Sequence, residues 1–258
     1  MLGLGINMIT GGGSGSPAFK SSGGNVNSYS ISLDGANDYL SQPDGDNIFD
    51  DLNSGSWSLS FYVKLSSLNS FILWKGTYPT DFLSVSIDSG GDVKLWGLSS
   101  SATTVYASWN SNMSIDTWYH VVITSDGSGT NRSNLCYVNG SNISLNTQSS
   151  ITSSTALETG TGATLFTAGS LYPYAYYQMN LDQIATWVTV LSASSILEIY
   201  SNNPTLTSNS GNYTDSARLQ RYLKIEEGTG TTTAENSSNG GAAMTLVNGP
   251  VWSTNKPW

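Results

Sequence analysis

The stretch DTWYHVVITSDGSGTNRSNLCYVNGSNISL, residues 116–145, carries the clearest information about the fold. Asn139 and Gly140 stand between two runs rich in β-branched and aromatic residues, and both residue types tolerate the positive φ that a two-residue type I′ hairpin requires. In the earlier run, residues 117–124, both alternating faces are mostly apolar, which is typical of a central strand. The stretch therefore predicts a hairpin beside a strand that is buried on both faces.

Short segments of the same kind follow one another from residue 29 onward, separated by Gly, Asn, Asp and Ser. In residues 57–63, Trp, Leu, Phe and Val alternate with Ser and Tyr, so one face of this strand is expected to pack inward. Only residues 191–202 favour a helix, with Ser192 as the N-cap and apolar residues spaced to face one way. The pattern predicts an all-β protein with one short helix over an end of a sandwich.

The length and composition of the chain limit the classes of function that it can have. A chain of 258 residues suits a single all-β domain. The net charge is −9 and the basic residues are scattered, which argues against nucleic acid as a partner. One cysteine excludes an internal disulfide. We expect no membrane span, because no segment approaches about 20 apolar residues, and no secretory signal, which implies synthesis in a cytoplasm.

Four motifs, in this order, resemble laminin G-like domains of the concanavalin A-like lectin/glucanase superfamily. They are SISLDGANDYLS (30–41), GSWSLSFYVKL (55–65), DTWYHVVITSDG with LCYVNG (116–140) and MNLDQIATWVTVLSASSILEIYSN (179–202). The resemblance covers about residues 29–203 and implies a two-sheet antiparallel jelly-roll sandwich.

The tail of the chain, residues 221–253, resembles text that normally precedes the first motif of such domains. Because the terminal strands of a jelly roll lie close together, residues 221–258 are expected to complete the sandwich from the other end. The jelly roll would then extend over residues 21–258. A truncated second repeat is the alternative interpretation of this tail.

The apolar start and the Gly/Ser-rich run within residues 1–20 predict a flexible apolar arm with a hinge. Together with the laminin G-like body, this arm is similar to structural proteins of tailed phages. That likeness implies a non-enzymatic virion surface protein, a capsid decoration or a tail or fibre component, made in the host cytoplasm. The arm would bind other virion proteins, and the chain would act as a homo-oligomer or within an assembly. A freestanding carbohydrate-binding lectin-like protein is the alternative, and a glycan hydrolase is the third.

The residue types that most often perform chemistry give no catalytic constellation. His120 and Cys136, each the only one of its kind, fall in predicted strands, where structural roles are expected. Glycoside hydrolases need two carboxylates that flank the scissile bond. The glutamates are scattered, and neighbours such as Glu226 and Glu227 point to opposite faces if they lie in a strand. We therefore expect no catalytic residues.

Two sets of aspartates are candidate calcium ligands, because carboxylate oxygens suit this hard cation. The resemblance implies Asp34 with Asp182, although Gln183 stands where the family usually has a glutamate. The second set, Asp44 and Asp46 with Asp50 and Asp51, belongs to the local stretch PDGDNIFDD. The alternative for these residues is turn formation, in which Asp and Gly supply capping and positive φ.

Two tyrosine-rich or tryptophan-containing stretches are candidates for binding a host-surface glycan. The run LYPYAYYQMN (171–180) places Tyr172, Tyr174 and Tyr176 at alternate positions, and WKGTYPTD (74–81) adds Trp74 and Tyr78. Aromatic rings can stack on the flat face of a sugar. The alternative is burial against a neighbouring subunit, since tyrosine is also enriched at protein interfaces.

Overall fold

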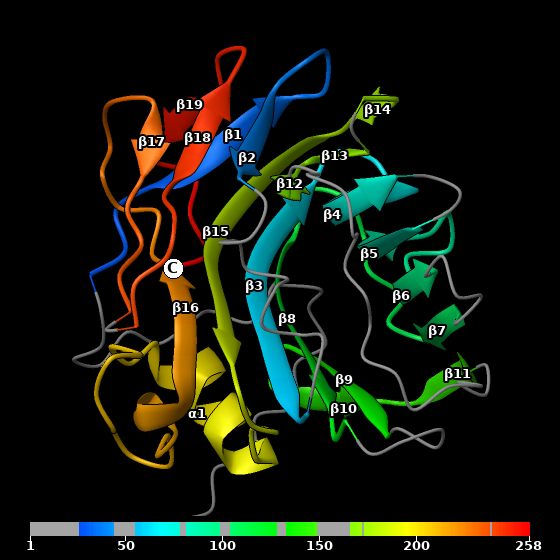
Figure 1. The fold of residues 1–258 in the computed structure, drawn as a ribbon, viewed down its shortest axis with the longest axis vertical. Coiled ribbons are helices and arrows are strands. Elements are labelled where there is room, and N and C mark those ends of the chain that lie inside the picture. The colour runs from blue at the N-terminus through cyan, green and yellow to red at the C-terminus, as the bar shows by residue number, and fades with distance from the viewer. Residues whose placement is uncertain are drawn as a thin grey trace, which may run out of the picture.

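Two large antiparallel sheets make up most of the protein (Figure 1). The computed structural model describes residues 26–43, 55–77, 81–98, 104–127, 133–148, 166–171, 173–237 and 239–258. Apolar side chains from both sheets form one continuous core between them. This architecture confirms the predicted all-β, two-sheet jelly-roll sandwich.

The first sheet, sheet A, has eight strands in the order β10-β9-β8-β3-β15-β1-β19, and β16 also pairs with β15. The long strand β15 pairs with β1 along its first half and with β16 along its second half. The bounds are β1 Ser30–Asp34, β3 Trp57–Leu65, β8 Trp118–Ser125, β9 Asn134–Val138, β10 Ser141–Ile143, β15 Gln178–Trp187, β16 Leu219–Leu223 and β19 Val251–Ser253.

The second sheet, sheet B, has nine strands in the order β11-β7-β6-β5-β4-β12-β2-β18-β17. A separate short hairpin joins β13 (Ser170–Leu171) and β14 (Ala175–Tyr176). The bounds in sheet B are β2 Tyr39–Gln42, β4 Ser70–Thr77, β5 Asp81–Ile87, β6 Val93–Leu98, β7 Thr104–Trp109, β11 Leu145–Gln148, β12 Phe166–Ala168, β17 Thr232–Thr233 and β18 Met244–Val247.

The hairpin predicted from residues 116–145 is present. Asn139 and Gly140 have φ of 51° and 76°, as a type I′ turn requires, and they connect β9 to β10. Strand β8 lies between β3 and β9 and is buried on both faces over most of its length. The local sequence rules therefore placed both the turn and the central strand correctly.

A second apolar core lies on the outer face of sheet A. Helix α1 (Ala193–Asn202) packs there near the end of the sandwich that carries the β9–β10 hairpin (Figure 1). Ser192 caps the helix by accepting a hydrogen bond from the Ser195 amide, as predicted. The members of this core come from sheet A, from α1 and from the segment after it: Val122, Tyr137, Ala185, Trp187, Leu191, Ile196, Ile199, Leu206, Tyr213, Leu219 and Tyr222.

The two ends of the described chain lie side by side. Strand β19 pairs with β1 in sheet A, and β18 pairs with β2 in sheet B, so the blue and red ribbons of Figure 1 are neighbours. Met244 and Leu246 of β18 point into the main core. The predicted arm, residues 1–20, lies outside the described residues. In the part of the chain that the structure describes, no helix is long and apolar enough to cross a membrane.

Candidate functional site

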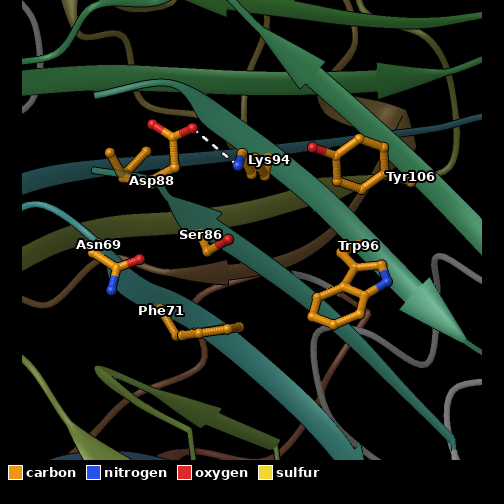
Figure 2. A pocket seen from close by; sticks show the side chains of 8 residues that line it. Asn69, Phe71, Ser86, Asp88, Lys94, Trp96 and Tyr106 are labelled. Atoms are coloured by element: carbon orange, nitrogen blue, oxygen red, sulfur yellow. Dashed lines mark ion pairs between the residues drawn. The ribbon is translucent and has the colours of Figure 1, made fainter. Parts of the chain in front are cut away.

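A hollow of about 280 Å³ opens on the outer face of sheet B, over strands β4 to β7 (Figure 2). Alternation along β5 explains its position, because Leu83, Val85 and Ile87 enter the core while Ser84 and Ser86 face outward. The outward side chains that line the hollow are three aromatic and four polar ones: Phe71, Trp96, Tyr106, Asn69, Ser86, Asp88 and Lys94. Its volume is close to the lower end of the about 300–1,000 Å³ typical of small-molecule sites.

The aromatic wall of the hollow belongs to a longer row of rings across the sheet. Trp96 contacts Phe82 edge to face, with 4.7 Å between the ring centroids. Phe82 stacks on Trp74, with 4.9 Å between the centroids. Trp74 in turn contacts Phe71 at 5.8 Å, and Phe71 contacts Tyr177 at 5.9 Å. Such contacts fix ring orientations beyond simple burial. The indole of Trp96 is therefore held in place before any ligand arrives.

The polar wall contains an ion pair. The Lys94 Nζ and the Asp88 Oδ2 are 2.9 Å apart, and both side chains are about a quarter exposed, at 28% and 26%. The hydrogen bond to Asp88 raises the pKa of Lys94. Burial raises the pKa of Asp88, but bonds from the Asp92 amide, Lys94 and the Gly90 amide outweigh it and lower that pKa overall. Both groups stay charged at neutral pH, and together they add no net charge to the hollow.

The structure describes three of the five residues that the sequence predicts to bind a glycan: Trp74, Tyr174 and Tyr176. Trp74 is 1% exposed, so it supports the aromatic row without offering a free face. Tyr174 is 63% exposed beside the β13–β14 hairpin, and Tyr176 packs against Tyr39 at 5.8 Å. The other two, Tyr172 and Tyr78, lie outside the described residues.

Sequence reasoning missed Trp96, Phe71 and Tyr106, although a usable signal existed. In the run VKLWGL, residues 93–98, Val93 and Leu95 alternate with Lys94 and Trp96. An indole and an ammonium on the polar face of a strand mark an exposed aromatic site. The neighbours Phe71 and Tyr106 are recognisable only once the strand pairing is known.

The first predicted calcium set is not brought together. Asp34 is exposed, and its Oδ1 accepts backbone amides within the DGAN turn. It pairs with Gln178, which lies four residues from Asp182 along β15, or roughly 13 Å at normal strand rise. Asp182 is fully buried. The two carboxylates therefore do not fit a shared ion, and the second set, Asp44 and Asp46, lies outside the described residues.

His120 is enclosed between sheet A and helix α1. Its Nε2 hydrogen-bonds with the Ser60 hydroxyl at 2.8 Å, and its ring stacks on Tyr62 at 4.4 Å. Burial lowers the pKa of His120 to about 3, so the ring is neutral at pH 7. Cys136 is buried in the main core, and burial raises the pKa of its thiol. These surroundings agree with structural roles for both residues.

The buried histidine predicts a specific pH dependence of stability. Between pH 6.5 and 3 the unfolded chain protonates this side chain while the folded chain does not, so acid favours unfolding. In a His120→Phe variant this contribution is absent. Between pH 6.5 and 4.5 the wild type is expected to lose about 2 kcal/mol of unfolding free energy relative to the variant, measured by urea unfolding at each pH. Parallel pH profiles for the two proteins would contradict the burial of a neutral ring.

Two facing antiparallel sheets with an aromatic, polar-rimmed hollow on one outer face define a lectin-like sandwich domain. The family model described as the concanavalin A-like lectin/glucanases superfamily, in its laminin G-like form, matches residues 34–197. The chain therefore belongs to this superfamily. No curated protein matches it in sequence.

Several solved structures are similar to the chain. A putative carbohydrate-binding protein from Bacteroides ovatus aligns with TM-score 0.56 and 13% identity over 87% of this chain and 59% of its own. A heptameric SAP-like pentraxin from Limulus polyphemus aligns with TM-score 0.48 and 14% identity, over 82% of this chain and 96% of its own. Domains LG4-5 of the mouse laminin alpha1 chain align with TM-score 0.43 and 12% identity, over 61% of this chain and 40% of their own. At 13% identity the likeness to the Bacteroides ovatus protein concerns the fold alone.

Proposed function

We propose that the protein is a glycan-binding, non-catalytic domain whose ligand stacks on Trp96. The observation that carries this proposal is the fixed indole beside a charged but electrically balanced pair. The apolar face of a pyranose packs on an aromatic ring, while its hydroxyls can accept from Lys94 and donate to Asp88. Because the pair adds no net charge, the hollow suits a neutral sugar.

The polar wall supports binding without hydrolysis. Glycoside hydrolases use two carboxyl groups about 5 to 9.5 Å apart, one of which carries a proton that it donates. Among the described residues that line the hollow, Asp88 is the only carboxylate. Its pKa is lowered, so it holds no proton to give at neutral pH.

The proposed setting is the surface of a phage particle, as capsid decoration or as a tail or fibre component. The support is the combination of an apolar stretch and a Gly/Ser-rich hinge in residues 1–20 with a lectin-like body. In this setting the arm would bind other virion proteins and the hollow would face host glycans. The alternative is a freestanding carbohydrate-binding protein. A virion component co-purifies with particles, whereas a freestanding lectin binds glycans with no particle present.

A Trp96→Ala variant tests the binding proposal. Loss of the stacking surface is expected to weaken binding to neutral oligosaccharides at least tenfold, or about 1.4 kcal/mol, as for other aromatic hot spots. The measurement is a titration with the best ligand from an array of gluco-, galacto-, xylo- and arabino-oligosaccharides.

Trp118→Ala is the matched control for this experiment. Trp118 is also a half-buried indole, but it lies on sheet A, where its Nε1 donates to the Asn255 Oδ1 at 3.1 Å. Its removal is expected to leave glycan affinity unchanged. Equal affinity of the Trp96→Ala variant and the wild type would reject the hollow as the binding site.

A further inference from the structure

The carboxylate in the polar wall of the hollow has few acceptor positions left for a ligand. A carboxylate offers about four such positions, two on each oxygen. The Asp88 Oδ1 accepts from the Gly90 amide at 2.8 Å and from the Asp92 amide at 3.0 Å. The Asp88 Oδ2 accepts from the Lys94 Nζ at 2.9 Å. Within the part of the chain that the structure describes, one acceptor position on Oδ2 is therefore left for a ligand.

The lysine of the pair leaves one donor position beside that acceptor. An ammonium group has three N–H donors. Asp88 takes one of them, and the Tyr106 hydroxyl is a second hydrogen-bond partner of Lys94. Figure 2 shows the Lys94 ammonium between Asp88 and Tyr106. Among the described contacts the third N–H is left for a ligand, and it lies next to the open position on the Asp88 Oδ2.

One donor and one acceptor at this separation match two neighbouring hydroxyls of a sugar ring. Staggered torsions place the oxygens of a vicinal diol gauche to each other, unless both are axial and trans. Two gauche oxygens are about as far apart as the Lys94 Nζ and the Asp88 Oδ2. One hydroxyl can therefore donate to Asp88 while the other accepts from Lys94. Paired hydrogen bonds to charged groups add both strength and geometric specificity.

The position of the pair along β6 determines how a stacked sugar reaches it. Trp96 and Lys94 lie on the same face of β6, two residues apart, or roughly 7 Å at normal strand rise. A single pyranose that stacks on Trp96 therefore reaches the pair with one edge of its ring. The pair lies where the chain turns from β5 into β6, between Asp88 and Asp92. The diol is thus on the leading edge of the sugar, and the rest of the glycan leaves past Trp96.

The flanks of the pair limit which edge of the sugar can lead. Phe71 on β4 is the strand partner of Ser86, and Ser86 is the strand partner of Lys94. In Figure 2 the pair lies between Asn69 and Phe71 on one side and Tyr106 on the other. If the 2,3-diol led, the substituents on C1 and C4 would run sideways into these walls. If the 3,4-diol leads, the C1 substituent points away from the pair.

We infer that the hollow recognises the free 3,4-diol of a non-reducing terminal pyranose, an inference that rests on the glycan-binding function proposed above. One hydroxyl of the diol donates to Asp88 and the other accepts from Lys94, while the ring stacks on Trp96. A residue inside a 1,3- or 1,4-linked chain carries a substituent on O3 or O4. Such a residue loses one of the two hydrogen bonds and collides with the β5–β6 turn. The ligand class is therefore the ends of glycan chains, not their interior.

A panel of deoxy sugars tests this inference on the wild type by isothermal titration calorimetry. The parent probes are methyl β-D-glucopyranoside and methyl β-D-galactopyranoside. The 3-deoxy and 4-deoxy derivatives of the better parent are expected to bind about tenfold more weakly, because each loses a hydrogen bond to a charged group. The 2-deoxy derivative is expected to bind as the parent does. Equal affinities throughout, or a loss with the 2-deoxy derivative in place of the 4-deoxy derivative, would overturn the inference.

Substituents on the same parent distinguish the end of a chain from its interior. A methyl group on O4 imitates an interior residue of a 1,4-linked chain and is expected to weaken binding at least as much as the 4-deoxy change. A longer alkyl group on the anomeric oxygen is the matched control, and it is expected not to weaken binding, because this substituent leaves past Trp96. Tolerance of the O4 methyl group would overturn recognition of chain ends.

A lysine variant tests the protein side of the contact. Lys94→Met keeps most of the aliphatic stem but removes the ammonium, so the penalty for deleting one of the two hydroxyls is expected to disappear. Lys64→Met is the matched control, because Lys64 is a half-buried lysine on β3 of sheet A. It is expected to keep both penalties. Unchanged penalties in Lys94→Met would overturn the contact.

The same titrations separate a failure of this inference from a failure of glycan binding. Binding that depends on Trp96 but not on the 3- and 4-hydroxyls would overturn the diol contact and leave the proposed function standing. No binding of either parent sugar, together with no binding on the oligosaccharide array, would overturn both.

Discussion

A Met244→Asp variant is expected to lose more than about 4 kcal/mol of unfolding free energy, which would leave the domain largely unfolded. Met244 lies on β18 and is 0% exposed within the main core. A carboxylate at this position would lose its hydration without gaining a partner. The expected loss is large because β18 is one of the C-terminal strands that close sheet B against β2.

Thr245→Asp is the control for this prediction. Thr245 follows Met244 on the same strand but is exposed on the opposite face, where it pairs with Ser41. Its replacement is expected to cost about 1 kcal/mol or less, since aspartate only fits a strand poorly. Urea unfolding of the three proteins measures both values. Similar, small losses in both variants would mean that β18 is not part of the core.

A Trp187→Ala variant is expected to lose about 3 to 5 kcal/mol of unfolding free energy. Trp187 is fully buried in the second core, on the outer face of sheet A. Its Nε1 donates to the Tyr213 hydroxyl at 2.9 Å, and that hydroxyl donates to the Leu206 carbonyl at 2.8 Å. The variant would leave a cavity and break this chain of hydrogen bonds.

Val188→Ala is the matched control, because Val188 follows Trp187 and is 43% exposed. Its expected cost is within about 0.5 kcal/mol. Denaturant unfolding monitored by far-ultraviolet circular dichroism gives both values. A loss below about 1 kcal/mol for Trp187→Ala would show that the layer over sheet A contributes little to folding.

Local rules predicted much of the fold. The Asn139–Gly140 turn, the Ser192 cap and the inward face of residues 57–63 each depend on neighbours in sequence, and each is present in the structure. Periodicity and turn chemistry are sufficient for such features. The family resemblance then supplied the arrangement of the two sheets.

The second core could not be predicted in the same way. Ser58 and Ser60 alternate with apolar residues and look like solvent-facing positions, yet both are buried. The Ser58 hydroxyl donates to the Thr189 carbonyl and accepts from the Leu191 amide. The segment that covers these serines is more than 100 residues away in sequence, so no local pattern indicates that they are buried.

The candidate sites depend on the same long-range information. Trp96 and Lys94 lie on the polar face of their strand in the sequence, but the hollow exists only because β4, β5, β6 and β7 are in a particular register. Likewise, the buried Asp182 accepts a hydrogen bond from Asn27, which is 155 residues away in the sequence, so no local pattern indicates this contact.

The most direct test of glycan binding in the hollow is an NMR titration of the indole N–H signals. The chain has eight tryptophans, each with one such signal. On addition of the oligosaccharide selected by the array, the Trp96 signal is expected to shift most, while those of Trp118 and Trp252 stay in place. Shifts at Trp118 or Trp252 with an unchanged Trp96 signal would contradict the proposed site.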